Sequence, residues 1–111
     1  MEGNSGNVLY IETNRTVVRG LQIEVTGNSG NTTGIYSRNN SEGLYEKNII
    51  KSTSSGSANK AIRFYNYSQI GPDRSLFLNN IIYNFDTLNS YAFLVEWQKQ
   101  TDQSARLYNN T

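Results

Sequence analysis

Short runs of alternating apolar and polar residues recur along this chain at a nearly constant interval. One set of runs begins at Leu9, Ile35, Ile62 and Phe93, which are separated by 26, 27 and 31 positions. The character alternates over two residues, which is the periodicity of a β-strand with one buried face. The residues expected to point inward are Leu9, Ile11, Ile62, Phe64, Phe93 and Val95. The residues between them are predicted to point outward.

A second set of runs repeats out of phase with the first. Its members are Val18-Arg19-Gly20-Leu21-Gln22-Ile23, Tyr45-Glu46-Lys47-Asn48-Ile49-Ile50, Phe77-Leu78-Asn79-Asn80-Ile81-Ile82 and Leu107-Tyr108-Asn109-Asn110-Thr111. Their fourth positions are separated by 27, 32 and 30 residues. Two sets with a matching period indicate a solenoid, in which each repeat covers the apolar face of its neighbour.

The middle of each run in the second set predicts a bend between two short strands. The bend position holds Gly20, Lys47, Asn79 and Asn109. Gly and Asn accept positive φ angles, so Lys47 departs from the pattern. The next position holds Asn48, Asn80 and Asn110, which we expect to stack as a ladder of side-chain amides bonded from coil to coil.

Composition narrows the functional classes. The chain has 111 residues, a length typical of a single domain. Its net charge of +1 argues against duplex DNA or an anionic membrane as partner. No apolar run reaches the roughly 18 residues of a membrane span, and no signal peptide is present in this chain. The sequence holds neither Cys nor His, which removes thiol nucleophiles, imidazole bases and the usual zinc ligands. We therefore expect no metal, no cofactor and no catalytic residue in this stretch.

With its strands, bends and Asn positions, the chain resembles the right-handed parallel β-helix superfamily, which includes pectate lyases, polygalacturonases, tailspikes and adhesins. The expected fold is all-β, a right-handed parallel β-helix of about four coils with no substantial helix. Its handedness comes from the resemblance and from the general right-handedness of crossovers. The expected single domain spans 1–111, with a flexible lead-in at 1–7 and coils at about 8–34, 35–61, 62–91 and 92–111.

The catalytic motifs of the best-known members can be compared with this chain. The Asn-Thr-Asp, Asp-Asp, Gly-His-Gly and Arg-Ile-Lys motifs of the polygalacturonase-like hydrolases do not occur here. Calcium-dependent pectate lyases gather several acidic residues, whereas the aspartates here are Asp73, Asp86 and Asp102, all expected in loops. Asp73 and Asp102 fall in equivalent loops of successive coils, where we interpret them as turn residues rather than as a metal or acid pair.

The outward positions of the first strand set form two predicted columns. One column is Tyr10, Tyr36, Arg63 and Leu94, and the other is Glu12, Arg38, Tyr65 and Glu96. Aromatic rings beside charged groups suit sugars, whose apolar faces stack and whose hydroxyls need partners. The residues predicted to bind carbohydrate are Tyr36, Arg38, Arg63, Tyr65, Glu96 and Trp97. The same columns would also stabilise a sheet with no ligand, because aromatic and opposite-charge neighbours favour strand pairing.

These observations lead to one functional expectation and two alternatives. The leading expectation is a non-catalytic, carbohydrate-associated or adhesive β-helix segment, extracellular or virion-associated by resemblance. Its partner would be a polysaccharide or another glycan, and we expect neither nucleic acid nor membrane as partner. One alternative is a truncated polysaccharide lyase or hydrolase whose catalytic coils lie outside this stretch. The other is a structural module whose copies stack end to end.

The ends of the predicted solenoid bear on the last alternative. Solenoids normally end in atypical capping repeats, and neither end of this sequence shows one. The chain is therefore expected to be a segment of a longer solenoid, or to form homo-oligomers through its open coil edges.

Overall fold

The structure, a computed structural model, describes residues 2–3, 6–26, 32–38, 42–53, 58–66, 73–97 and 103–111. Within these ranges every regular element is a β-strand, and the strands form parallel sheets. Sheet A contains β1 (Glu2–Gly3), β4 (Gln22–Val25), β7 (Ile49–Ser52) and β10 (Ile81–Tyr83). Sheet B contains β2 (Asn7–Ile11), β5 (Thr33–Arg38), β8 (Lys60–Asn66) and β11 (Tyr91–Trp97). Sheet C contains β3 (Val17–Arg19), β6 (Leu44–Glu46), β9 (Asp73–Leu78) and β12 (Gln103–Tyr108).

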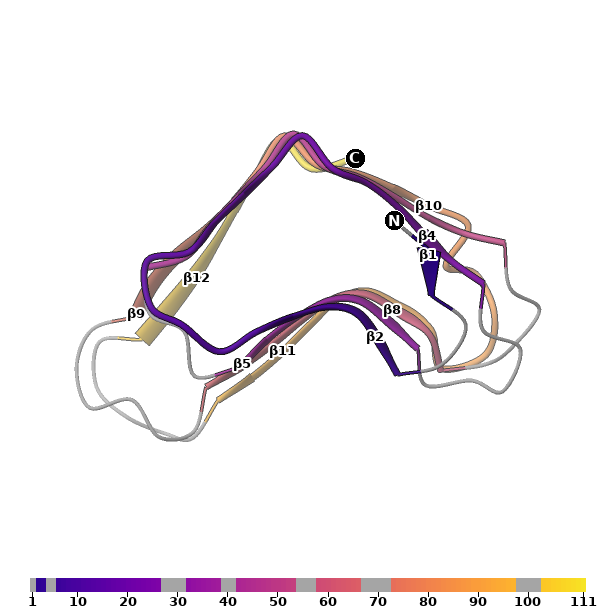
Figure 1. The fold of residues 1–111 in the computed structure, drawn as a ribbon, viewed down its shortest axis with the longest axis horizontal. Coiled ribbons are helices and arrows are strands. Elements are labelled where there is room, and N and C mark those ends of the chain that lie inside the picture. The colour runs from indigo at the N-terminus through magenta and orange to yellow at the C-terminus, as the bar shows by residue number, and fades with distance from the viewer. Residues whose placement is uncertain are drawn as a thin grey trace.

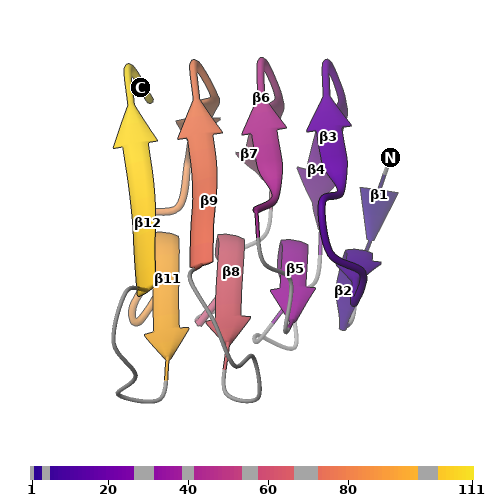
Figure 2. The same cartoon turned by 90° about the vertical axis from the view of Figure 1, so that its left-hand side faces the viewer.

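The chain visits the sheets in rotation, so neighbouring strands in a sheet come from successive coils, and the strands of the first and last coils form the sheet edges. The coils superpose in the view down the shortest axis of the molecule, which measures 20 Å (Figure 1). In each of sheets B and C, the strands lie next to one another in order from the N-terminal coil to the C-terminal coil (Figure 2). The predicted all-β solenoid of about four coils is confirmed.

The order of elements within a coil also follows the prediction. A sheet B strand is followed by a connection, and two short strands separated by a bend then lie in sheets C and A. Two boundaries differ. Residues Glu2–Gly3 lie within the predicted lead-in, but they form strand β1, which pairs with β4. Asp73, expected in a loop, is the first residue of β9 and pairs with Gln103, whereas Asp102 lies outside the described residues.

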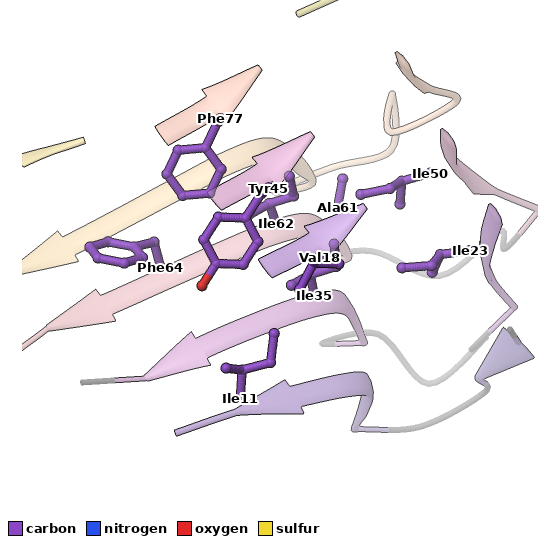
Figure 3. Packing of buried hydrophobic residues seen from close by; sticks show 10 residues of the cluster. All are labelled: Ile11, Val18, Ile23, Ile35, Tyr45, Ile50, Ala61, Ile62, Phe64 and Phe77. Carbon is purple, nitrogen blue, oxygen red and sulfur yellow. The ribbon is translucent and has the colours of Figure 1, made fainter. Parts of the chain in front are cut away.

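Inward side chains stack in columns along the solenoid. The column of sheet B is Leu9, Ile35, Ile62 and Phe93, that of sheet C is Val18, Tyr45, Phe77 and Leu107, and that of sheet A is Ile23, Ile50 and Ile82. In this core the rings of Tyr45 and Phe77 are parallel, with centroids 4.8 Å apart (Figure 3). Phe64 meets the Phe77 ring edge to face at 5.9 Å. Each fully buried side chain of this kind stabilises the fold by about 1.5–3 kcal/mol.

Gly34 lies in β5, beside the neighbouring strand β8 of the same sheet. A Cβ atom at this position would lie 2.7 Å from the carbonyl oxygen of Ala61 in β8 and 3.1 Å from Cγ2 of Ile50 in sheet A. The first contact is with the backbone of the next coil, which cannot move without disturbing the strand pairing. The backbone of the neighbouring strand therefore requires glycine at this position.

The bends between sheets C and A have the predicted backbone conformation. The φ angles at the bend are 68° for Gly20, 55° for Lys47, 54° for Asn79 and 50° for Asn109. Lys47 thus adopts the same left-handed conformation as its counterparts, although a side chain without a local hydrogen-bonding group pays a steric cost there. The repeated register of neighbouring coils imposes the conformation on this residue.

The residue after the bend forms a continuous ladder of amides. Oδ1 of Asn48 accepts from the backbone N–H of Leu21 at 3.0 Å, and Oδ1 of Asn80 accepts from the N–H of Asn48 at 3.1 Å. Oδ1 of Asn110 accepts from the N–H of Asn80 at 3.1 Å. The side-chain amides also bond directly, since Nδ2 of Asn48 donates to Oδ1 of Asn80 at 3.0 Å. The predicted asparagine ladder is confirmed.

Each ladder amide also binds the coil before it through a backbone carbonyl. Nδ2 of Asn48 donates to the carbonyl of Val18 at 3.1 Å, and Nδ2 of Asn80 donates to that of Tyr45 at 3.0 Å. Asn48 and Asn80 are both fully buried. Their amides therefore satisfy backbone groups that the bend would otherwise leave without partners inside the protein.

A second polar stack lies just before the strands of sheet B. Oδ1 of the buried Asn59 accepts from the N–H of Thr32 at 3.1 Å, and Oγ of Ser90 accepts from the N–H of Asn59 at 3.2 Å. Three different residue types occupy this stack, so no repeated residue in the sequence predicts it. The sequence indicates it only through the equivalent position of these residues before each strand of sheet B.

The ladder yields a prediction for stability. We expect Asn80→Ala to lower the free energy of unfolding by about 3 kcal/mol, because it removes the side-chain amide that bonds to buried backbone groups of Asn48 and Tyr45. Chemical denaturation followed by circular dichroism measures the change. Asn79→Gly is the matched control, since Asn79 is exposed and glycine accepts its positive φ. Equal losses in the two variants would contradict the ladder's role.

The strained bend at Lys47 yields a prediction of the opposite sign. We expect Lys47→Asn to raise the free energy of unfolding by about 0.5–1 kcal/mol, because asparagine tolerates the left-handed region better than lysine. Lys47→Ala serves as control, since it removes the long side chain without relieving the backbone. A gain of the same size in the alanine variant would show that the side chain, not the φ angle, causes the cost.

Candidate functional site

Both predicted columns are present on the outer face of sheet B, which we define by Tyr10, Glu12, Tyr36, Arg38, Arg63, Tyr65, Leu94 and Glu96. Tyr10 pairs in register with Tyr36, which pairs with Arg63, and Arg63 pairs with Leu94. Arg38 pairs with Tyr65, which pairs with Glu96. Glu12 lies just beyond the end of β2. The backbone of this sheet bends toward the interior, so its outer face follows a concave path (Figure 1).

Arg63 lies at the centre of this face. Its guanidinium carbon lies 4.8 Å from the centroid of the Tyr36 ring and 5.7 Å from that of the Tyr65 ring. Its Nε donates to Oε2 of Glu96 at 2.7 Å. Three successive coils therefore build one cluster, in which a cation lies over two aromatic rings and pairs with a carboxylate.

Electrostatics and burial favour the ionic form of Arg63 and the neutral form of Tyr36. The hydrogen bond with Glu96 is the largest cause that raises the pKa of Arg63. Burial raises the pKa of the Tyr36 phenol above its ordinary value, although the neighbouring Arg63 and Arg38 charges act in the opposite direction. At neutral pH Tyr36 therefore presents a phenol, which donates and accepts hydrogen bonds.

The N-terminal half of the face is looser. Tyr10 meets Tyr36 in an edge-to-face arrangement, with centroids 5.3 Å apart, and 44% of Tyr10 is exposed. Arg38 lies 3.9 Å from the carboxylate of Glu12. A hydrogen bond with Tyr10 is the largest cause that raises the pKa of Arg38. Arg38 thus contacts Tyr10 and Glu12, one step from the Arg63 cluster.

Lys60 begins the strand that carries Arg63 and Tyr65. It is only 7% exposed, and its Nζ donates to the carbonyl of Ala58 at 2.9 Å. Burial lowers its pKa, the charge of Arg63 lowers it further, and the charge of Glu96 raises it. Lys60 therefore contributes to the field of the cluster while its ammonium is held inside the protein.

The structure brings together four of the six predicted binding residues, namely Tyr36, Arg63, Tyr65 and Glu96. Arg38 lies beside them through its pairing with Tyr65. Trp97 pairs with Asn66 at the end of β11, but its side chain lies outside the described part of the chain. Tyr10 and Lys60 were not among the predicted binding residues. The register places Tyr10 beside Tyr36, whereas no alternation signal identifies Lys60.

The other outer faces also carry ion pairs. On sheet C, Arg19 pairs with Glu46 through Nε, and on sheet A, Lys51 lies 3.3 Å from the carboxylate of Glu24. Hydrogen bonds from Thr53 and Lys51 lower the pKa of Glu24. The two cation–π contacts of the described residues both involve Arg63. Within the described part of the chain, the cation–π contacts therefore distinguish the face of sheet B.

In the described ranges, no three or more Asp, Glu, His or Cys side chains are placed so that they could hold a metal ion. In the same ranges, no helix is long and apolar enough to cross a membrane.

Comparisons with protein-family models, with curated proteins and with solved structures found no match. The β-solenoid architecture therefore rests on the strand register and the coil repeats of this chain.

The buried lysine predicts a pH dependence. Burial lowers the pKa of Lys60 in the folded protein. Below the ordinary lysine pKa, the unfolded chain therefore binds more protons than the folded protein does. The contribution of this site to the free energy of unfolding therefore rises as pH increases toward the ordinary lysine pKa. We expect the stability of Lys60→Met relative to the parent protein to fall as pH increases from 7 toward about 10. Denaturation at several pH values measures this difference. A difference that stays constant over this pH range would contradict the prediction.

Proposed function

We propose that this chain is a non-catalytic, carbohydrate-binding segment of a right-handed parallel β-helix. The binding surface is the outer face of sheet B. The single observation that carries the proposal is the Arg63 cluster, in which the guanidinium lies over Tyr36 and Tyr65 and binds Glu96.

The chemistry of the cluster fits a saccharide better than other ligands. Sugar rings have apolar C–H faces that pack on aromatic rings, and they carry hydroxyl groups that donate and accept hydrogen bonds. The face offers the exposed ring of Tyr10 and the half-buried rings of Tyr36 and Tyr65, together with guanidinium donors and carboxylate acceptors. Tyr and Arg are also the residue types in which binding energy concentrates.

The shape of the sheet supports the same proposal. A concave row of strands, one per coil, offers repeated positions along the axis, as a polymer of repeating units requires (Figures 1 and 2). By resemblance, this strand face often carries the saccharide groove in the right-handed parallel β-helix superfamily. An extracellular or virion-associated setting follows from the same resemblance and belongs to the proposal.

Two alternatives belong to other classes. A truncated lyase or hydrolase would need catalytic coils outside this stretch, and new absorbance from an unsaturated product on acidic polysaccharides would support it. Copies that stack end to end would give a mass that grows with concentration in light scattering after size exclusion. The aromatic and ionic cluster on one face favours binding over a purely structural role.

The test is a glycan-binding screen on purified protein, followed by affinity measurement with the glycans that bind. We expect Arg63→Ala and Tyr36→Ala each to weaken binding by about tenfold, because each removes part of the central cluster. Circular dichroism and thermal unfolding verify that each variant is folded.

Matched controls lie on the other sheets. Arg19→Ala removes the arginine of a comparable ion pair on sheet C, and Tyr83→Ala removes a tyrosine of sheet A that is 44% exposed. Both should bind like the parent protein. The proposal fails if no glycan binds, or if the control variants lose as much affinity as the cluster variants.

A further inference from the structure

The charged groups on the outer face of sheet B are already matched with one another. Arg63 binds Glu96 at 2.7 Å, and Arg38 lies 3.9 Å from Glu12. The side chains of Arg63 and Glu96 are 29% and 33% exposed, so this pair is partly shielded from water. Partial shielding strengthens the interaction between the two charges and raises the cost of separating them.

Lys60, a further described cation on the strand of Arg63, does not change this balance at the surface. Lys60 is 7% exposed and donates to the carbonyl of Ala58. A ligand on the face therefore meets the guanidinium and carboxylate groups of the two pairs, whereas the lysine ammonium is already bonded to a backbone carbonyl.

An anionic sugar and a neutral sugar face different costs at this surface. A carboxylate or sulfate group that binds Arg63 must compete with Glu96, and it brings a like charge close to that carboxylate. A neutral sugar displaces neither partner, because one hydroxyl accepts from a guanidinium and another donates to a carboxylate. The Arg–Glu pair thus acts as a donor and acceptor set for hydroxyl groups.

We infer that the face selects uncharged saccharides and that Glu96 is the residue that excludes acidic ones. This inference rests on the proposed function and adds to it the class of ligand. Glu96 is then a specificity determinant, since it contributes an attractive acceptor for hydroxyls and a repulsive charge for acids.

The experiment compares sugars that differ only at C6, where the acidic sugar has a carboxylate in place of a hydroxymethyl group. The probes are immobilised oligosaccharides of galactose and glucose, set against oligosaccharides of galacturonic acid and glucuronic acid of the same length. The proteins are the parent chain, Glu96→Gln and Glu46→Gln. Glutamine retains an oxygen that accepts from Nε of Arg63, so the arginine keeps its place over the two rings.

We expect the parent protein to bind neutral probes and to bind the acidic probes at least about tenfold more weakly. Glu96→Gln should gain about tenfold on the acidic probes and change little on the neutral ones. Glu46→Gln removes the carboxylate of the comparable Arg19 pair on sheet C and should behave like the parent protein.

The failures of the two ideas are distinguishable. If the parent protein prefers the acidic probes, or if Glu96→Gln gains nothing on them, the ligand class is wrong while carbohydrate binding stands. If the parent protein and Glu96→Gln bind neither class, the proposed function and the inference both fail. An equal gain in Glu46→Gln would assign the effect to net charge and overturn the role of Glu96.

Discussion

Pairing between successive coils is the constraint on which the rest of this structure depends. A parallel strand inside the stack gains its hydrogen bonds from the coils above and below it, and Asn48 and Asn80 of the ladder also bind both neighbouring coils. The core follows the same rule, because the inward columns run along the stack and not across a broad interior. A thin apolar strip is therefore sufficient to hold this polar chain together.

The same constraint builds the candidate site. Coil stacking places position 36 beside position 63 and position 65 beside position 96, although these residues are about one coil apart in the chain. Once the register is set, Arg63 lies within reach of two rings and a carboxylate. A surface of this kind requires no loop closure, since regular strands position every member.

Local conformational preference yields to the register where the two conflict. Lys47 adopts the left-handed bend conformation at a position where the other coils have Gly or Asn. Position 34 holds glycine because the backbone of the next coil leaves no room for a side chain there. Lys60 is the first residue of β8, and the register of the coils places it in a buried position. This burial lowers the pKa of its ammonium group. These residues bear energetic costs that the stack as a whole offsets.

The coil repeat, the strands, the bends and the asparagine ladder follow from the order of amino acids, because alternation and spacing are local signals that recur in every coil. The same signals place Tyr36, Arg63, Tyr65 and Glu96 on one face, since alternation sets the side to which a strand residue points. The pairing of Arg63 with Glu96, rather than with a neighbour in its own column, depends on side-chain directions in the folded stack. The burial of Lys60 and the mixed stack at Thr32, Asn59 and Ser90 depend on contacts between coils, for which no periodic signal exists.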